Sequence, residues 1–159
     1  MHFDRNEEQQ LLAESLRRWL AGNYGFEQRR AILGSEAGAS DTAWSTFAEM
    51  GLTALPMPAE AEGFGAGAAD LIDVMEAFGE ALVVEPYLST LVAARLVERA
   101  GSDAQRTELL PRVASGEARM ALAHDEAGQR HGAARIATRA TRGADGYTLE
   151  GTKRVVMHA

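Results

Sequence analysis

The stretch from Arg119 to Gly132, RMALAHDEAGQRHG, divides the chain into two parts with different apolar patterns. Before it, apolar residues recur at helical spacing, and after it they alternate as they do in strands. The stretch itself is an apolar run, Met120 to Ala123, followed by charged residues and two glycines. A buried strand that leads into a glycine-containing loop is a frequent place for ligand-binding chemistry. Spacing alone favours the simpler interpretation, a strand at the entry to a domain followed by a solvated loop.

The composition is that of a globular protein, with 46% hydrophobic and 25% charged residues. The net charge of −7 argues against binding to nucleic acid or to an anionic membrane, because both attract basic surfaces. Apolar runs fall short of the roughly 18 residues of a membrane helix, and the polar start MHFDRNEEQQ is unlike a secretory signal. The lack of cysteine agrees with a reducing compartment. We therefore expect a cytoplasmic protein that binds neither nucleic acid nor a membrane.

Apolar residues at helical spacing predict six helices before the dividing stretch. The predicted helices cover Asn6 to Tyr24, Phe26 to Leu33, Asp41 to Met50, Ala68 to Leu82, Tyr87 to Ala100, and a last segment from Ser102 towards Ser115. Asp4 or Asn6 is suited to cap the first helix, and Ser102 with Gln105 forms a capping box for the sixth, which Pro111 is expected to interrupt. One core is predicted to hold Leu12, Leu16, Trp19, Phe47, Leu71, Met75, Phe78, Leu91 and Leu96.

Residues Leu52 to Gly67 are predicted to form a long irregular connection, because two prolines and three glycines exclude a regular element. A surface loop is the simpler interpretation. Its glycine-rich end, GFGAG at 63–67, is a weak candidate for a phosphate-binding loop, since such a loop normally follows a strand.

After the dividing stretch, four strands are predicted: Met120 to His124, Ile136 to Thr141, Tyr147 to Glu150, and Lys153 to Met157. Residues 143–146 are predicted as the turn between the second and third strands, and Gly151-Thr152 as the turn of a hairpin between the third and fourth. The predicted organisation is a helical domain over residues 1–116 and the start of a β domain over 117–159. Four strands with an open edge do not close a barrel or sandwich, so we expect a fragment or a chain completed by another one.

The adjacent residues His124, Asp125 and Glu126 are the clearest chemical candidates, and they do not predict a metal site. Neighbours on a strand point to opposite faces, which is poor geometry for shared metal ligation or for a catalytic triad. Asp125 and Glu126 could act as general acid and base, although a solvated pair explains them as well. The sequence has no nucleophile elbow, and no GxGxxG motif follows a strand.

Five stretches in a characteristic order carry a family resemblance over the whole chain. They read FDRNEEQQLLAESLRRWL, WSTFAEMGLTALPMPAEAEGFGAG, DLIDVMEAFGEALVVEPYLST, LLPRVASGEARMALAHDE and DGYTLEGTKRVV. In this order and spacing, the chain resembles the acyl-CoA dehydrogenases. The resemblance implies an α+β fold: an all-α N-terminal bundle followed by the first strands of the family's middle β domain.

The resemblance also implies a flavoprotein that oxidises an acyl-CoA thioester to the 2,3-enoyl-CoA. In the family, a carboxylate removes the α-proton while the β-hydride passes to N5 of FAD. That carboxylate belongs to a C-terminal helical domain, so the base is expected beyond Ala159 and no catalytic residue is expected in this chain.

The chain departs from the family pattern at its flavin contacts. The family's Thr-Glu-Pro-X-X-Gly-Ser-Asp falls on 125–132, which places Asp125 at the Thr and His131 at the Ser. The family's Trp-Ile-Thr falls on 155–157, so Val155 replaces the ring that covers the flavin and Met157 replaces a hydroxyl. A carboxylate at the first position would repel an electron-rich reduced flavin. The family's cofactor-binding positions, degenerate here, are Leu122, His124, Asp125, His131, Val155 and Met157.

These departures predict a subunit with weak or absent FAD binding that completes the active site of a partner. The chain resembles subunits of heteromeric enzymes of the steroid-degradation type. In those enzymes two unlike chains assemble, and FAD fills only half of the possible sites. The implied partners are a second acyl-CoA dehydrogenase-like chain or further copies of this one, an acyl-CoA substrate and an electron-transfer acceptor. By itself the chain is expected to be inactive and to associate or be poorly soluble. A self-sufficient FAD-binding enzyme and a non-enzymatic helical assembly module are the alternatives.

Overall fold

A computed structural model describes residues 6–127, 136–144 and 146–158. The described residues form α-helices, one 3-10 helix and one hairpin, in the order α1 (Glu7–Asn23), α2 (Phe26–Leu33), α3 (Asp41–Glu49), η1 (Ala59–Ala61), α4 (Ile72–Ala81), α5 (Tyr87–Ala100), α6 (Asp103–Ala114), β1 (Arg139–Gly143) and β2 (Gly146–Glu150). The α+β fold class is confirmed.

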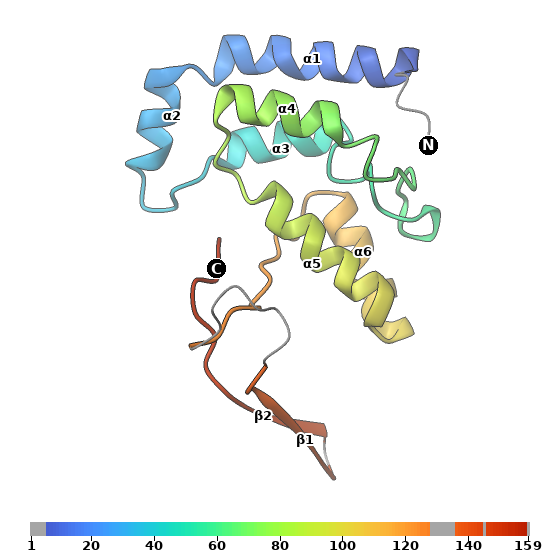
Figure 1. Ribbon diagram of the computed structural model, residues 1–159. Coiled ribbons are helices and arrows are strands. Elements are labelled where there is room, and N and C mark those ends of the chain that lie inside the picture. The colour runs from blue at the N-terminus through green and yellow to red at the C-terminus, as the bar shows by residue number, and fades with distance from the viewer. Residues whose placement is uncertain (1–5, 128–135, 145, 159) are drawn as a thin grey trace.

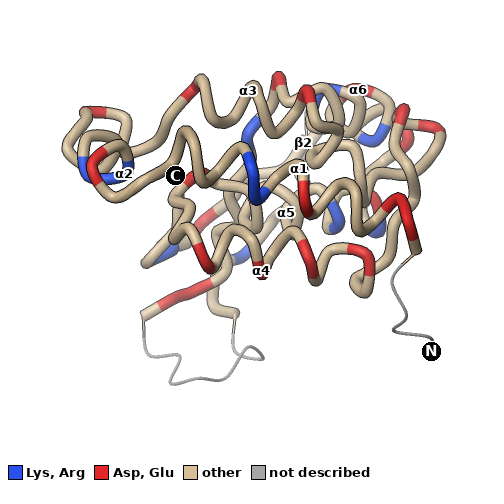
Figure 2. Tube along the Cα trace, turned by 90° about the horizontal axis from the view of Figure 1, so that it is seen from above, with Lys and Arg blue, Asp and Glu red and all other residues tan. Residues whose placement is uncertain are grey.

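The helices form the body of the molecule and the hairpin extends from one side of it. In Figure 1, α1, α3 and α4 lie together, α5 packs beside α6 below them, and the β1–β2 hairpin lies beyond α5. The chain after α6 passes beneath α5 before it reaches the hairpin. Figure 2 shows Lys and Arg positions interspersed with Asp and Glu positions along the helical part.

The helix ends follow the predicted caps closely. Asn6 caps α1 in a capping box with Gln9, and Ser102 caps α6 in a capping box with Gln105. The prediction that Pro111 interrupts α6 is wrong, because the helix continues to Ala114. A proline removes one hydrogen bond of the helix backbone. The burial of Leu110, Val113 and Ala114 around this last turn offsets that loss. Helix α4 begins at residue 72, later than the predicted residue 68.

Aromatic rings connect four helices through the core. Trp19 of α1 meets Phe47 of α3 edge-on with ring centroids 5.6 Å apart. Phe47 lies 4.8 Å from Phe78 of α4, and Phe78 lies 5.0 Å from Tyr87 of α5. Such contacts add about 0.5–1.5 kcal/mol each to the burial of the rings. The helical spacing of apolar residues predicted that Trp19, Phe47 and Phe78 face inward, and these rings lie at the centre of the core.

The predicted core is mostly confirmed, with one residue wrongly included. Leu16, Phe47, Phe78 and Leu91 are buried, and the half-buried members that pack against them are Leu12, Trp19, Leu71 and Met75. Leu96 is 53% exposed. It shares one face of α5 with exposed Leu88 and Val92, whereas the opposite face, which carries Leu91, enters the core.

The connection at 52–67 is a surface loop only in its second part, where Phe64 is 71% exposed, and its first part is buried. Leu52, Thr53 and Met57 are almost completely buried, and residues 59–61 form the short helix η1. The Thr53 hydroxyl donates to the carbonyl of Ala114 at 2.8 Å, which ties the connection to the end of α6. Prolines and glycines excluded long elements here, but they did not prevent burial, because backbone groups of the segment bond to one another.

The strands agree with the sequence only in part. The hairpin forms between β1 and β2, with Arg139 opposite Glu150 and Gly143 opposite Gly146, so the predicted turn at 143–146 is confirmed. The predicted strands at 120–124 and 153–157 are wrong, as is the hairpin around Gly151-Thr152. Residues 120–124 have no regular secondary structure, Val155 has a positive φ and Met157 lies in a turn. A single bridge joins Glu126 to Lys153. An extended segment becomes a strand only where a continuous partner pairs with it.

Candidate functional site

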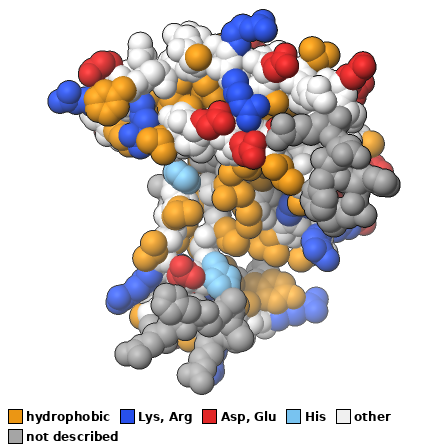
Figure 3. All heavy atoms as spheres, turned by 45° about the horizontal axis from the view of Figure 1, so that its top comes forward, with side chains coloured by type: hydrophobic (Ala, Val, Ile, Leu, Met, Phe, Trp, Pro, Cys, Tyr) orange, Lys and Arg blue, Asp and Glu red, His pale blue; other side chains and the backbone are white. Residues whose placement is uncertain are grey.

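A hollow of about 260 Å³ lies between α5 and the segments that follow α6. Figure 3 shows hydrophobic and histidine side chains beside the recess between the helical body and the hairpin. The hollow is lined by Leu88, Ser89, Val92, Leu122, His124, Asp125, Val155 and Met157. Aliphatic side chains form most of this lining, and the hydrogen-bonding groups come from three residues. An amphipathic recess of this kind suits an apolar ligand with a few polar atoms.

Thr90 of α5 fixes one wall of the hollow. Its hydroxyl is fully buried, accepts from the Met120 amide at 3.1 Å and donates to the Met120 carbonyl at 3.3 Å. The segment that leads to Leu122 and His124 is therefore attached to α5 although no strand pairs with it at this point. The sequence pattern predicted that pairing in a sheet would hold this segment, and in the structure the Thr90 side chain holds it instead.

Glu126 fixes the other wall by joining three segments. Its carboxylate accepts from Lys153 Nζ at 2.7 Å, from the amides of Ala137 and Thr138 at 2.6 and 3.1 Å, and from the Thr138 hydroxyl. The hydrogen bond from Lys153, followed by those from Thr138 and Ala137, lowers the pKa of Glu126 to about 2. The carboxylate thus stays ionised and holds the chain on both sides of the hairpin.

Backbone pairing then brings the sequence-distant parts of the site together. The Arg154 amide donates to the Asp125 carbonyl at 2.8 Å, beside the bridge between Glu126 and Lys153. Val155, the next residue, consequently lines the same hollow as Asp125. The alternation of an extended chain sends the side chains of Asp125 and Glu126 in different directions, and only Asp125 lines the hollow. Because Glu126 is held by Lys153, the two carboxylates do not form an acid–base pair.

Two imidazole contacts supply polarity at the hollow. His124 Nδ1 lies 3.1 Å from Asp125 Oδ1, and His158 Nδ1 lies 3.1 Å from the Ser89 hydroxyl. Ser89 also donates to the Pro86 carbonyl, so its hydroxyl is held within the first turn of α5. The Asp125 carboxylate therefore has His124 as its partner, and an imidazolium at this position would carry a compensating positive charge.

The structure places five of the six sequence-predicted cofactor positions in this one hollow: Leu122, His124, Asp125, Val155 and Met157. His131 lies outside the described residues. Sequence reasoning missed Leu88, Ser89 and Val92. The signal for them was present, because Leu88, Val92 and Leu96 recur at spacing i, i+4, i+8 on a face that the core does not use.

The lining lacks the groups that commonly hold a flavin ring. Among the described residues that line the hollow there is no Phe, Tyr or Trp, the one aromatic ring is the His124 imidazole, and the one hydroxyl is that of Ser89. Val155 is 81% exposed, and its backbone has a positive φ of 51°, a strained conformation for a β-branched residue. The residues present would receive an isoalloxazine ring through aliphatic contacts and through Asp125 with its histidine partner.

The glycine-rich segment 63–67 is not a phosphate-binding loop in this structure. The amides of Phe64, Gly65 and Ala66 donate to the carbonyls of Ala54, Met57 and Leu55, and the Gly67 amide donates to the side chain of Asp70. A phosphate cradle requires amides that point at the ligand. Gly63 serves close packing instead, since a side chain there would collide with the backbone of Met57, and Gly65 has a positive φ of 65°.

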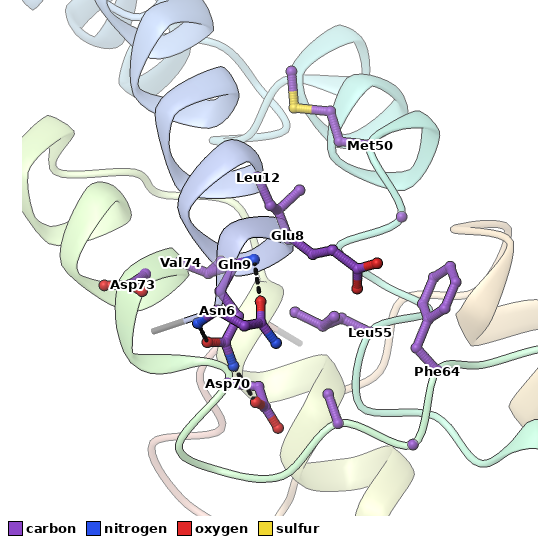
Figure 4. A pocket seen from close by; sticks show the side chains of 13 residues that line it. Asn6, Glu8, Gln9, Leu12, Met50, Leu55, Phe64, Asp70, Asp73 and Val74 are labelled. Atoms are coloured by element: carbon purple, nitrogen blue, oxygen red, sulfur yellow. Dashed lines mark hydrogen bonds between the residues drawn. The ribbon is translucent and has the colours of Figure 1, made fainter. Parts of the chain in front are cut away.

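A second hollow, of about 420 Å³, lies between the start of α1, the end of α3 and the start of α4. Figure 4 shows Gln9 between Asn6 and Asp70: the Asn6 and Gln9 side chains each accept from the other's backbone amide, and the Gln9 side chain donates to Asp70. Phe64 and Leu55 line the opposite side. Asn6, Leu12 and part of the glycine-rich segment 63–67 line this hollow, but none of the predicted cofactor positions does. The hydrogen bonds of Asn6, Gln9 and Asp70 hold the start of α1 against the segment before α4.

Over residues 6–127, 136–144 and 146–158, no three His, Asp or Glu side chains converge in a way that could hold a metal ion. Within the same ranges, no helix has the length and apolar character needed to cross a membrane.

With this geometry in hand, comparison with known proteins identifies the family. Residues 6–117 match the acyl-CoA dehydrogenase N-terminal domain. Acyl-CoA dehydrogenase FadE12 of Mycobacterium tuberculosis is 30% identical over 154 residues, which are 95% of this chain and 39% of that protein. The chain belongs to the acyl-CoA dehydrogenase family. It spans about two fifths of the length of such relatives.

Solved structures agree with the fold. A variant of the Tcur3481-Tcur3483 steroid ACAD is 33% identical, with a TM-score of 0.86 over 94% of this chain and 41% of that one. The ChsE4-ChsE5 complex from Mycobacterium tuberculosis shares the fold, with 24% identity and a TM-score of 0.84 over 98% of this chain and 42% of that one. The predicted resemblance to this family and to its steroid-type members is confirmed.

Proposed function

We propose that this chain is part of an acyl-CoA dehydrogenase subunit that binds FAD weakly or not at all and completes the flavin site of a partner chain. The single observation that carries the proposal is the lining of the 260 Å³ hollow. It gathers Asp125, Val155 and Met157 at the positions where the family resemblance places a hydroxyl, an indole and a second hydroxyl.

The scaffold around the hollow is intact, which supports an assembling role. Glu126 and Lys153, which the family pattern also contains, keep their contact at 2.7 Å and hold the chain in place. Groups that would touch the flavin have changed, whereas groups that fix the backbone have not. A subunit under selection for assembly alone would show this difference.

A self-sufficient FAD-binding enzyme is the second candidate, and one contact favours it. The contact between His124 and Asp125 reduces the electrostatic penalty of a carboxylate beside reduced flavin, because a protonated imidazole would neutralise it. The remaining losses, one hydrogen bond and one stacked ring, amount to about 2 kcal/mol, or roughly 30-fold in affinity.

The proposed substrate is an acyl-CoA thioester whose acyl group is large and apolar. The exposed face of α5 supports this, because Leu88 and Val92 line the hollow and Leu96 continues the apolar surface along the helix. A heteromeric partner of the same family is proposed in line with the name of the ChsE4-ChsE5 complex. When bound, FAD would accept the hydride, and an electron-transfer acceptor would reoxidise it.

Flavin content per subunit tests the proposal. The full-length chain is purified alone and with its co-expressed partner, and FAD absorbance is measured against protein. We expect well under one FAD per copy of this chain, and a rise after the combined changes Asp125→Thr, Val155→Trp and Met157→Thr. A matched control replaces Arg139, Tyr147 and Leu149 of the exposed hairpin, which lie away from the hollow, and should not change flavin content. One FAD bound per unmodified chain by itself would exclude a degenerate site.

A further inference from the structure

Residues 25–39 form an excursion from the helical body that is closed at its base by one buried carboxylate. Glu85 is 5% exposed and accepts from the Tyr24 hydroxyl at 2.7 Å and from the Ser40 amide at 3.0 Å. Tyr24 immediately precedes the excursion and Ser40 immediately follows it. Burial and the hydrogen bond to Glu85 raise the pKa of Tyr24, so its hydroxyl remains a donor. The excursion is therefore held in a defined position.

Helix α2, which the excursion carries, contacts the core through the half-buried Ile32. The structure describes all eight of its residues, and none is buried. Phe26 is 74% exposed and Leu33 is 50% exposed, while Leu82, next to the helix, is 60% exposed. Arg29 donates to the Leu82 carbonyl at 2.8 Å, which holds α2 beside this residue. Figure 1 shows α2 standing apart from the other helices.

Apolar and charged residues share the outward face of α2. Phe26, Arg30 and Leu33 are spaced i, i+4, i+7, which places them on one side of a helix, with Glu27 at its flank. Figure 3 shows hydrophobic and basic side chains together at the end of the molecule that α2 forms. Acidic charge lies in the first turn of the helix and basic charge in the last. This order of charges complements itself when two copies of the helix run antiparallel.

We propose that α2 is a contact between two copies of this chain, in which the two helices pack antiparallel around a two-fold axis. Phe26 would pack against Leu33 of the second copy, and Glu27 would pair with Arg30 of the second copy, each contact occurring twice by symmetry. The proposal does not rest on the flavin hypothesis. Because two helices of eight residues bury well below the roughly 1,200 Å² of a standard interface, the contact is expected to be weak and transient.

Charge exchange within the helix tests the contact. Sedimentation equilibrium of the full-length chain measures dimerisation for the unmodified protein, for Glu27→Arg, for Arg30→Glu and for the double variant. Each single change places like charges together and should weaken dimerisation by about threefold to tenfold, while the double change restores opposite charges and should recover most of it. Glu36→Arg, in the same excursion but outside α2, is the matched control. Equal dimerisation of all variants would overturn the proposal.

Cross-linking gives a test that does not depend on charge or on small changes in helix stability. The chain has no cysteine, so a single introduced thiol reports one contact. Chains with Phe26→Cys mixed with chains with Leu33→Cys should form a disulfide at least about fivefold faster than either variant alone, since the geometry of a disulfide needs Cα atoms within about 7 Å. Two copies of Phe26→Cys would be about 10 Å apart along the helices. Equal rates in the mixture and in the separate variants, or a monomer at about 1 mM, would overturn the proposal.

Discussion

At the scale of single residues, the candidate site is positioned by side chains that never line it. Glu126 and Thr90 each bond to segments distant in the sequence, and between them they hold both walls of the hollow. The ionised carboxylate of Glu126 holds together segments that backbone hydrogen bonds would join in a sheet. The buried hydroxyl of Thr90 holds the backbone of Met120 against α5 in the same way. Changes at such residues are expected to alter the site without removing any group that touches a ligand.

The titration of Glu126 is the first prediction. Its pKa is lowered from 4.5 to about 2, chiefly by Lys153, so carbon-13 NMR of the carboxyl group should show a midpoint near 2. Because the folded pKa is below the unfolded one, the stabilisation is complete above about pH 4.5 and is lost as the pH falls towards 2. Lys153→Met should raise the midpoint, while Arg154→Met, one residue along the chain, should leave it almost unchanged. A midpoint near 4.5 in the unmodified chain would contradict the network.

Removal of the Thr90 hydroxyl is the second prediction. Thr90→Val keeps the shape but leaves the amide and carbonyl of Met120 without this partner in a partly buried position. The free energy of unfolding in urea should fall by about 1–3 kcal/mol. Thr46→Val removes a hydroxyl that bonds only to the helix carbonyl of Thr42 at an exposed position, so its effect should stay within about 0.5 kcal/mol. Similar losses for the two variants would show that Thr90 does not anchor the segment.

At the scale of secondary-structure elements, α5 serves two environments with two apolar faces. One face carries Tyr87, Leu91 and Ala94 into the core, where all three are almost completely buried. The other carries Leu88, Val92 and Leu96, which are roughly half exposed, and the first two of these line the hollow. A helix that is apolar on both faces but buries only one is expected to meet a ligand or another chain on the second.

Two leucines of α5 provide the third prediction. Leu91→Ala opens a cavity in the core and should lower the free energy of unfolding by about 2–4 kcal/mol. Leu96→Ala removes the same atoms from an exposed site and should cost less than about 0.5 kcal/mol. Equilibrium unfolding in urea measures both. A large loss for Leu96→Ala would mean that this residue is covered in solution.

At the scale of the whole molecule, exposed apolar surface is concentrated at the hairpin side. The second face of α5 is one part of this surface. Tyr147 and Leu149 of β2 are 68% and 73% exposed, and Val155 and Met157 are also mostly exposed. Such surface adjoins the hollow and the open edges of a two-stranded sheet. The described residues therefore present a face that is suited to covering by further protein.

Association through this face is the fourth prediction. Residues 1–159 expressed alone should form concentration-dependent oligomers in sedimentation velocity, because apolar surface and strand edges remain uncovered. Val92→Glu combined with Leu96→Glu should reduce this association, whereas Arg95→Glu, between them on the same helix, should have a smaller effect. The α2 charge variants should not prevent association through α5, which separates the two surfaces. A monodisperse monomer that is stable at high concentration would contradict the prediction.

The sequence by itself determined the helices, because their signals are local. Apolar spacing located the helices, and capping boxes at Asn6 and Ser102 located two of their starts within one residue. The ordered motifs identified the family, and from them the cofactor positions could be predicted, of which the described ones lie in one hollow. Each of these features depends on residues fewer than about ten positions apart, or on motifs that can be compared directly.

Only the tertiary structure decided which apolar face is buried and which extended segments pair. Leu96 has the same spacing as a core residue, but burial depends on the neighbouring element, which spacing does not report. Met57 lies in a segment rich in proline and glycine, yet other loops and helices surround it completely. Lys153 reaches Glu126 across 27 positions, and Ser89 lines the same hollow as Asp125 although the two residues are more than 30 positions apart. Such contacts follow from how the chain returns on itself, which is a property of the packed molecule.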